Sequence, residues 1–263
     1  MNQSSKPYIV SDPWAKLQQF TDARIGLGRC GTSMPTEEVL KFKLSHAQAR
    51  DAVHQPVQTE AMASKLQQNG FTPLVLHSSV QDRSEYLTRP DKGRSLSQNS
   101  VDLLTHEQTG YDICVVICDG LSAPAIHESA LDVTIHFLNI VRQSTLTASP
   151  VCMVTNGRVA IGDQIGHLLQ ARMVVLLIGE RPGLSSPNSL GAYLTYAPLP
   201  GLTDESRNCI SNIRKGGMST GEAVRKIAYL VEEAFTLKHS GVALKDRMNS
   251  DYIPLLSFQS KVI

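Results

Sequence analysis

The sequence predicts an α/β fold, in which a mostly parallel, doubly wound (Rossmann-like) sheet is flanked by helices and preceded by a helical N-terminal extension. Two observations carry this prediction. Continuous apolar runs at 113–118, 151–155 and 173–178 are typical of strands that are covered on both faces. Helical patterns with capping residues lie between these runs, and such alternation with short connections implies parallel strands joined by crossover helices.

The composition gives no sign of a nucleic-acid or membrane protein. Lys and Arg number 25 against 24 Asp and Glu, so there is no basic excess. The chain has no apolar run of about 18 residues and no signal-peptide pattern, and we therefore expect a soluble intracellular protein. Its five cysteines are irregularly spaced and form no C-x-x-C pair, which supports neither a disulfide framework nor a zinc site.

The N-terminal part is predicted to be an arm followed by two helices. Residues 1–20 are polar and are expected to form an arm with one short helix. Residues 26–31 have the spacing G-x-G-x-x-G, but residues 21–25 are too polar and too few for the buried strand that a dinucleotide site requires before it, so we reject that interpretation. The two helices are expected at 36–54 and 57–69.

The remainder is expected to form a second domain, so that residues 1–70 make up the N-terminal arm and helices and residues 71–263 the α/β domain. Its other expected elements are a strand at 74–76, a loop at 86–91, a helix from Asp91 to Leu104, a helix at 123–142 capped by Ser122, a helix at 163–170, a strand at 190–196 of undecided direction, and a helix from the capping box Ser219–Glu222 to His239.

Polar turns follow three successive strands of the predicted sheet. They are 119–120 (Asp-Gly), 156–158 (Asn-Gly-Arg) and 179–181 (Gly-Glu-Arg). Because the carboxyl ends of parallel strands meet at one edge, we expect these turns to lie together. Such an edge suits a polar small molecule that carries amide or phosphate groups. The plainer alternative for 179–181 is a strand-ending turn with a solvated ion pair.

Common catalytic motifs are missing from the sequence. It contains no G-x-x-x-x-G-K-[ST] loop, no G-x-S-x-G elbow and no H-E-x-x-H pair. No set of nucleophile, base and orienting residue can be assigned from the residues. We therefore expect that this chain does not complete a reaction alone.

Several sequence blocks resemble the small subunit of ethanolamine ammonia-lyase. The resemblance covers roughly residues 20–245, and the blocks occur in the same order as in that family. The blocks are Gly28-Arg29-x-Gly31, Tyr86–Arg94, Asp119–Ser122, Gly162–Gly166, Gly179–Gly183 and Cys209–Ile213.

The resemblance implies an adenosylcobalamin-dependent lyase that converts ethanolamine to acetaldehyde and ammonia by radical chemistry. In that family the large subunit holds the substrate and the radical steps, and the small subunit closes over the cobalamin. The enzyme is therefore expected to be active only with both chains, in a hetero-oligomer of several large–small pairs. No nucleic-acid or membrane partner is expected.

Carried over by motif position, the cobalamin contacts of the family's small subunit fall on Val159, Glu180 and Cys209. Glu180 would accept hydrogen bonds from the amide groups of the corrin, while the other two residues would pack against its periphery. The alternative for Cys209 is a buried core thiol. Arg158 and Arg181 could instead pair with carboxylates of the partner subunit.

The expected binding mode of the cofactor is base-on. The sequence lacks the D-x-H-x-x-G motif that in other cobalamin proteins supplies a histidine to the cobalt. The cofactor is therefore expected to keep its own dimethylbenzimidazole on the metal, with no axial ligand from this chain.

The N-terminus bears on localisation. Some family members carry a long extension that directs packaging into a protein-shelled microcompartment, whereas this chain begins only about 20 residues before the resemblance. We expect either the bacterial cytoplasm or an ethanolamine-utilisation microcompartment, with the packaging extension short or absent.

Two other classes of function remain open at this point. One is a non-catalytic α/β module that binds a nucleotide or cofactor, and the other is a structural subunit that never touches the cofactor. The first places residues 158–159 and 179–181 at a ligand, and the second places them at a protein contact.

Overall fold

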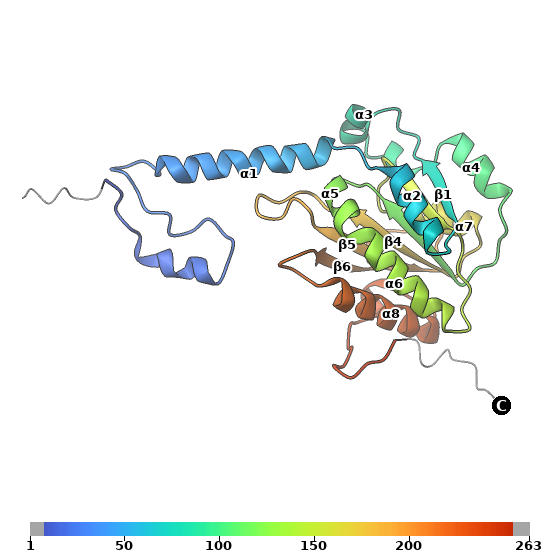
Figure 1. Ribbon diagram of the computed structural model, residues 1–263. Helices are drawn as coiled ribbons and strands as arrows, with labels where there is room; N and C mark the ends of the chain where they lie inside the picture. The colour runs from blue at the N-terminus through green and yellow to red at the C-terminus, as the bar shows by residue number, and fades with distance from the viewer. Residues whose placement is uncertain (1–7, 255–263) are drawn as a thin grey trace, which may run out of the picture.

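The computed structural model describes residues 8–254 (Figure 1). The elements, including short 3₁₀ helices and one π-helical turn (η3), follow in this order: η1 Pro13–Gln19, α1 Thr36–His54, α2 Thr59–Gln68, β1 Pro73–His77, α3 Arg83–Thr88, η2 Lys92–Arg94, α4 Gln98–Thr105, β2 Ile113–Cys118, α5 Ala123–Ala125, η3 Ile126–Ala130, α6 Leu131–Arg142, β3 Val151–Thr155, α7 Ile161–Leu168, β4 Met173–Gly179, β5 Leu190–Tyr196, η4 Asp204–Ser206, β6 Arg207–Ile213, α8 Thr220–Leu237 and η5 Gly241–Ala243.

The fold is α/β, with a six-stranded mixed sheet flanked by helices. The strand order is β1-β3-β2-β4-β5-β6. The strands β1 to β4 are parallel, whereas β5 runs antiparallel to β4 and β6 antiparallel to β5. The mostly parallel, doubly wound sheet is therefore not confirmed. The connections before and after β5 contain no crossover helix, so the chain returns beside the strand it has just left.

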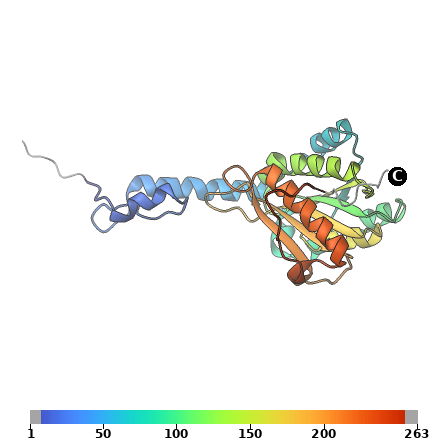
Figure 2. The ribbon, with the colours of Figure 1, turned by 90° about the horizontal axis from the view of Figure 1, so that it is seen from below.

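Helices pack on both faces of the sheet (Figures 1 and 2). Strand side chains alternate between the faces, so that on β2 Val115 and Ile117 join one core while Cys114 and Val116 join the other. Apolar residues of α2, α6 and α8 complete the first core, which spans the adjacent strands β3, β2, β4, β5 and β6. Residues of α4 and α7 complete the second core, which lies over the adjacent strands β1, β3, β2 and β4.

Side-chain caps set several helix starts. Ser122 Oγ accepts from the Ala125 N–H at 3.2 Å, and the expected helix at 123–142 forms as α5, η3 and α6 in succession. Ser219 Oγ likewise accepts from the Glu222 N–H at the start of α8.

Two expectations in the stretch between β1 and β2 are wrong. The predicted loop at 86–91 lies partly in α3, because Asp82 Oδ1 caps that helix by accepting from the Glu85 N–H at 2.8 Å. The single helix expected from Asp91 to Leu104 is divided into η2 and α4. Ser97 starts α4 by accepting from the backbone N–H of Ser100.

The N-terminal segment extends away from the sheet, with the arm folded back along α1 (Figures 1 and 2). Residues 26–31 lie in this arm, where Gly26, Gly28 and Gly31 have positive φ and no strand precedes them within residues 8–25. They are turn glycines, as the rejection of a dinucleotide site implied. The domain boundary near residue 70 stays a prediction. No helix within residues 8–254 is long and apolar enough to span a membrane.

Candidate functional site

The three polar turns after β2, β3 and β4 lie together, as the sequence predicted. Asp119 Oδ1 accepts a hydrogen bond from the Gly157 N–H at 3.3 Å, which joins the first two turns. The Leu121 N–H donates to the Gly179 carbonyl at 2.9 Å, which joins the first turn to the third. Parallel pairing of these strands brings their carboxyl ends to one edge.

Two glycines allow the first and third turns to touch through their backbones. A Cβ on Gly120 would lie 2.3 Å from the Gly179 carbonyl oxygen, and a Cβ on Gly179 would lie 2.3 Å from the Ser122 carbonyl oxygen. Gly120 also has a φ of 55°, which L side chains rarely adopt. Both positions therefore require glycine.

Arg83, at the start of α3, connects this edge to the N-terminal extension. Its Nη1 lies 3.2 Å from Asp119 Oδ2 and 3.2 Å from Asn156 Oδ1. Its Nη2 donates to the Gly120 carbonyl at 2.9 Å, and its Nε donates to the Val53 carbonyl in α1 at 2.7 Å. Sequence reasoning did not find Arg83, because a single arginine on a short helix carries no signal for partners 36 and 73 residues away.

Tyr86 is packed between two guanidinium groups at the same edge. The Arg83 and Arg158 guanidinium carbons lie 4.5 Å and 4.1 Å from the centre of its ring. Its hydroxyl donates to the Gly157 carbonyl at 3.0 Å, and Arg158 Nη2 donates to the Tyr86 carbonyl at 3.0 Å. Burial raises the pKa of Tyr86, so the phenol stays protonated and remains a donor.

Asp119 is the buried acid of the edge. Burial raises the pKa of its carboxyl, while the neighbouring backbone N–H groups and the Arg83 guanidinium oppose that rise. Its two oxygens already accept from Gly157 and Arg83. Because its side chain is also buried, Asp119 organises the edge and does not face a ligand freely.

Glu180 joins the end of β4 to β5 and β6. Its carboxylate accepts hydrogen bonds from the hydroxyls of Ser189 and Ser211 and, at 3.3 Å, from the backbone N–H of Asn212. Among residues 8–254, no ion pair joins Glu180 to the exposed Arg181. The alternative of a solvated ion pair in this turn is therefore wrong.

The three sequence-predicted contact residues gather around Tyr193. Val159, Glu180 and Tyr193 line one cavity of about 440 Å³, and Cys209 is directly opposite Tyr193 in the pairing of β5 with β6. Cys209 is exposed, so the alternative of a buried core thiol is wrong. Desolvation by its neighbours, followed by the negative charge of Glu180, raises the pKa of the Cys209 thiol, although a hydrogen bond with Tyr193 opposes this.

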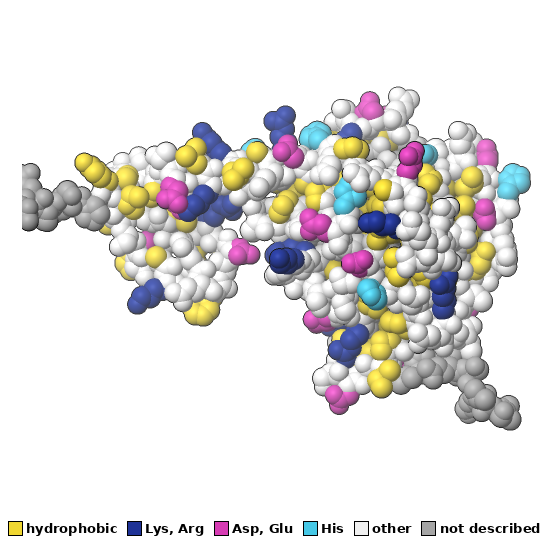
Figure 3. Space-filling model, viewed as in Figure 1, with side chains coloured by type: hydrophobic (Ala, Val, Ile, Leu, Met, Phe, Trp, Pro, Cys, Tyr) yellow, Lys and Arg dark blue, Asp and Glu magenta, His cyan; other side chains and the backbone are white. Residues whose placement is uncertain are grey.

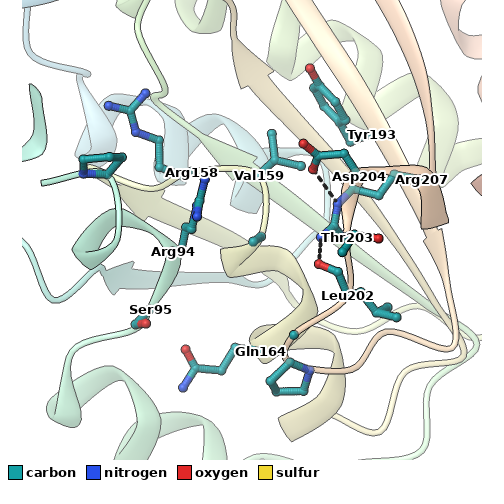
Figure 4. A pocket seen from close by; sticks show the side chains of 14 residues that line it. Arg94, Ser95, Arg158, Val159, Gln164, Tyr193, Leu202, Thr203, Asp204 and Arg207 are labelled. Atoms are coloured by element: carbon teal, nitrogen blue, oxygen red, sulfur yellow. Dashed lines mark hydrogen bonds and ion pairs between the residues drawn. The ribbon is translucent and has the colours of Figure 1, made fainter.

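A larger cavity of about 790 Å³ adjoins the first and shares Arg158, Val159 and Tyr193 with it (Figure 4). Arg94 and Arg158 lie on one side, Tyr193 lies on the other, and Val159 lies between them (Figure 4). Arg158 Nε is buried and has no hydrogen-bond partner among residues 8–254. The two cavities form one concave surface beside the start of α7. Its lining includes the guanidinium groups of Arg94, Arg158 and Arg181, and that of Arg207, which is paired with Asp163.

A buried ion pair between β6 and α7 lies beneath the lining of the larger cavity. Arg207 Nη1 in β6 lies 2.6 Å from Asp163 Oδ1 in α7, and both side chains are 2% exposed. Arg207 Nη2 also donates to the Leu202 carbonyl at 2.8 Å, which holds the loop at the rim of the larger cavity (Figure 4). This pair connects α7 to β6, a strand that no helix within residues 8–254 covers on this face of the sheet.

The arrangement suits binding better than catalysis by this chain alone. No group of three His, Cys, Asp or Glu able to hold a metal ion occurs within residues 8–254. The residues lining the two cavities supply apolar surface, guanidinium groups and the carboxylates of Glu180 and Asp204, but no histidine. Such a surface can form the wall of a site that another molecule completes.

Comparisons with known proteins agree on one family. The family model described as ethanolamine ammonia-lyase light chain (EutC) matches residues 11–245. A relative from Xanthomonas campestris is 52% identical over 239 residues, which is 89% of this chain and 88% of the relative. One from Pseudomonas putida strain F1 is 51% identical over the same shares. One from Ralstonia nicotianae is 47% identical over 94% of this chain and 92% of its own. All three are called ethanolamine ammonia-lyase small subunit. With the family model matching most of its length, this chain belongs to the ethanolamine ammonia-lyase small-subunit (light-chain) family.

Proposed function

We propose that this chain is the small subunit of an adenosylcobalamin-dependent ethanolamine ammonia-lyase, which converts ethanolamine to acetaldehyde and ammonia. In this proposal the chain forms one wall over the cobalamin, and a large subunit holds the substrate. The observation that carries it is the gathering of Val159, Glu180 and Cys209 around Tyr193, on a concave surface of a chain in this family.

The surface fits a corrin, which presents a broad apolar ring edged by amide groups. Val159 and the Tyr193 ring offer apolar contact, and both are half-buried. Glu180 offers carboxylate oxygens to amide N–H groups, and its bonds to Ser189 and Ser211 hold the carboxylate in place for that contact. Arg94 and Arg158, across the larger cavity, suit the phosphodiester of the cofactor's nucleotide loop.

The cofactor, when bound, supplies the radical that starts the reaction, and this chain's residues position it and exclude water from one side. The residues that line the two cavities include no imidazole, which is the commonest metal ligand among protein side chains. We therefore propose that the cofactor binds with its own dimethylbenzimidazole on the cobalt.

We further propose an assembly of several large–small pairs, in the bacterial cytoplasm or in a microcompartment. The exposed Arg181 at the site's edge is suited to pairing with a carboxylate of the large subunit. We also propose that residues 1–70 and residues 71–263 are the two structural units of the chain.

The decisive experiment measures ammonia release from ethanolamine by this chain mixed with a matching large subunit and adenosylcobalamin. Each chain alone is the control. We expect activity in the mixture only. A non-catalytic binding module would retain cobalamin without the large subunit, and a structural subunit would assemble without affecting cobalamin retention. Either result, with no ammonia released by an assembled mixture, would overturn the proposal.

A second experiment tests whether Glu180 contributes to cobalamin binding. Glu180→Ala should lower cobalamin retention in the assembled enzyme by about tenfold, because it removes a charged acceptor. Glu60→Ala, an exposed glutamate on α2, is the matched control and should leave retention unchanged. Unchanged cobalamin affinity in Glu180→Ala would refute the role of Glu180.

A further inference from the structure

The N-terminal extension, residues 8–54, carries an unusual share of the molecule's exposed apolar side chains. Ten of the seventeen large hydrophobic residues that are exposed within residues 8–254 lie between positions 8 and 44. They are Tyr8, Ile9, Val10, Trp14, Leu17, Phe20, Met34, Leu40, Phe42 and Leu44. They are spread over the projecting arm and α1 (Figure 3). Apolar surface gathered in this way marks a contact with another molecule.

The helix α1 presents a free apolar stripe. Leu40 and Leu44 are 60% and 61% exposed and stand one turn apart on the same side of the helix. Only Ala49 and Ala52, at the base of α1, are buried. Since helices in proteins owe most of their stability to tertiary packing, a surface that covered this 19-residue helix would stabilise it.

The arm is folded into a defined shape and is not a loose tail. Val10 and Arg29 pair through backbone hydrogen bonds of 2.8 Å and 3.0 Å. Gln18 Nε2 donates to the Ile25 carbonyl at 2.8 Å, and Arg24 Nη2 donates to Ser45 Oγ in α1 at 2.7 Å. The arm and α1 are therefore organised in advance for a partner, which lowers the entropy cost of binding.

The extension leaves the body at the edge where the candidate site lies. Its base is held there by the Arg83 bond to the Val53 carbonyl. Arg24 Nη2 also approaches the Leu184 carbonyl at 3.5 Å, in the loop that follows Glu180. A protein that closes over the site from outside this chain would therefore meet α1.

The charge of the extension favours a protein over a lipid surface. Residues 8–54 contain six Lys or Arg and five Asp or Glu, so there is no basic excess to attract anionic lipid. A helix with balanced charge and an exposed Leu pair one turn apart suits helix-in-groove recognition between proteins.

We propose that the Leu40–Leu44 face of α1, steadied by the arm, docks into an apolar groove of the large subunit. The identity of this partner rests on the proposed function. Docking at this place would bring the large subunit over the cofactor wall and hold it there.

The test compares two double variants of the full chain. Leu40→Glu with Leu44→Glu should raise the Kd for a purified large subunit by about tenfold or more, because both side chains leave the buried centre of an interface. Leu237→Glu with Val242→Glu alters two residues that are 46% and 64% exposed outside the extension, and it should bind as the wild type does. Far-UV circular dichroism should show both variants folded, since all four residues are exposed.

Four results would overturn the proposal, three in binding or assembly and one in activity. The α1 variant could bind like the wild type, or the control variant could lose as much affinity as the α1 variant. The isolated wild-type chain could instead form a dimer that the α1 variant converts to a monomer, which would identify a second copy as the occupant. Ammonia release by the same mixtures distinguishes failure of the docking proposal from failure of the proposed function. An inactive but α1-dependent complex would leave the docking intact and refute the lyase assignment. Full activity of the α1 variant at wild-type subunit concentrations would refute the docking and leave the lyase assignment intact.

Discussion

One face of the sheet is covered by α2, α6 and α8 from β3 to β6, whereas the other is covered by α4 and α7 only from β1 to β4. On the first face β6 contributes Ile210 to a closed core. On the second face the same strand presents Cys209 and Ser211 to the surface, beside Tyr193 of β5. The candidate site therefore lies where helical coverage stops, and the six-stranded width of the sheet exceeds what two helices on that face can hide.

The largest expected effect concerns the ion pair at the border of the uncovered region. Asp163→Asn should lower the free energy of unfolding by about 3–5 kcal/mol, because Arg207 is left buried without its charged partner. Urea denaturation followed by circular dichroism measures this. The control is Asp204→Asn, whose carboxylate is 3.4 Å from Arg207 Nε but 96% exposed, and which should change stability little. Equal losses in both variants would show that the buried pair does not support the border.

A pair of adjacent residues on β6 compares the two faces directly. Ile210→Ala should cost about 2–5 kcal/mol of unfolding free energy, because it opens a cavity in the covered core. Cys209→Ala should stay within about 0.5 kcal/mol, because its side chain is exposed. Cobalamin retention in the assembled enzyme should fall for Cys209→Ala only. A large stability loss in Cys209→Ala would mean that the second face is also a closed core.

The smallest expected effect is chemical. A raised pKa leaves less thiolate at any given pH, so alkylation of Cys209 by iodoacetamide should reach half its maximal rate at a higher pH than a cysteine in a short peptide. Mass spectrometry of the labelled peptide across a pH series gives this profile. The urea-unfolded chain serves as the control and should titrate as the short peptide does. A profile shifted to lower pH would contradict the desolvated environment beside Glu180.

The residues alone predicted the edge of the site well, because turn chemistry is local. Asp119, Gly157 and Glu180 each follow an apolar strand, and parallel pairing of those strands was sufficient to place them together. The helix starts at Ser122 and Ser219 were predictable for the same reason, since a cap acts within three residues of its own position.

The uncovered strands were harder to predict. The direction of β5 depends on the connection at 180–189, which contains no helix, and no local pattern shows that. The strand β6 was not predicted from its residues, because it lacks the apolar alternation of a half-buried strand. Its Arg207 is buried through a partner in α7. Cys209 and Ser211 lie on the part of the second face that no helix of residues 8–254 covers. The shortage of apolar residues there reflects missing coverage, which only the tertiary structure reveals.

The backbone contact between Gly120 and Gly179 has a mechanical consequence. Since no side chain separates the turns that follow β2 and β4, neither turn can yield by a change of rotamer, and a displacement of one is passed to the other. The rim of the site therefore behaves as a stiff frame. A bulky molecule that settled against this frame would have to be accommodated by the connections at 181–188 and 198–203, which contain no helix or strand.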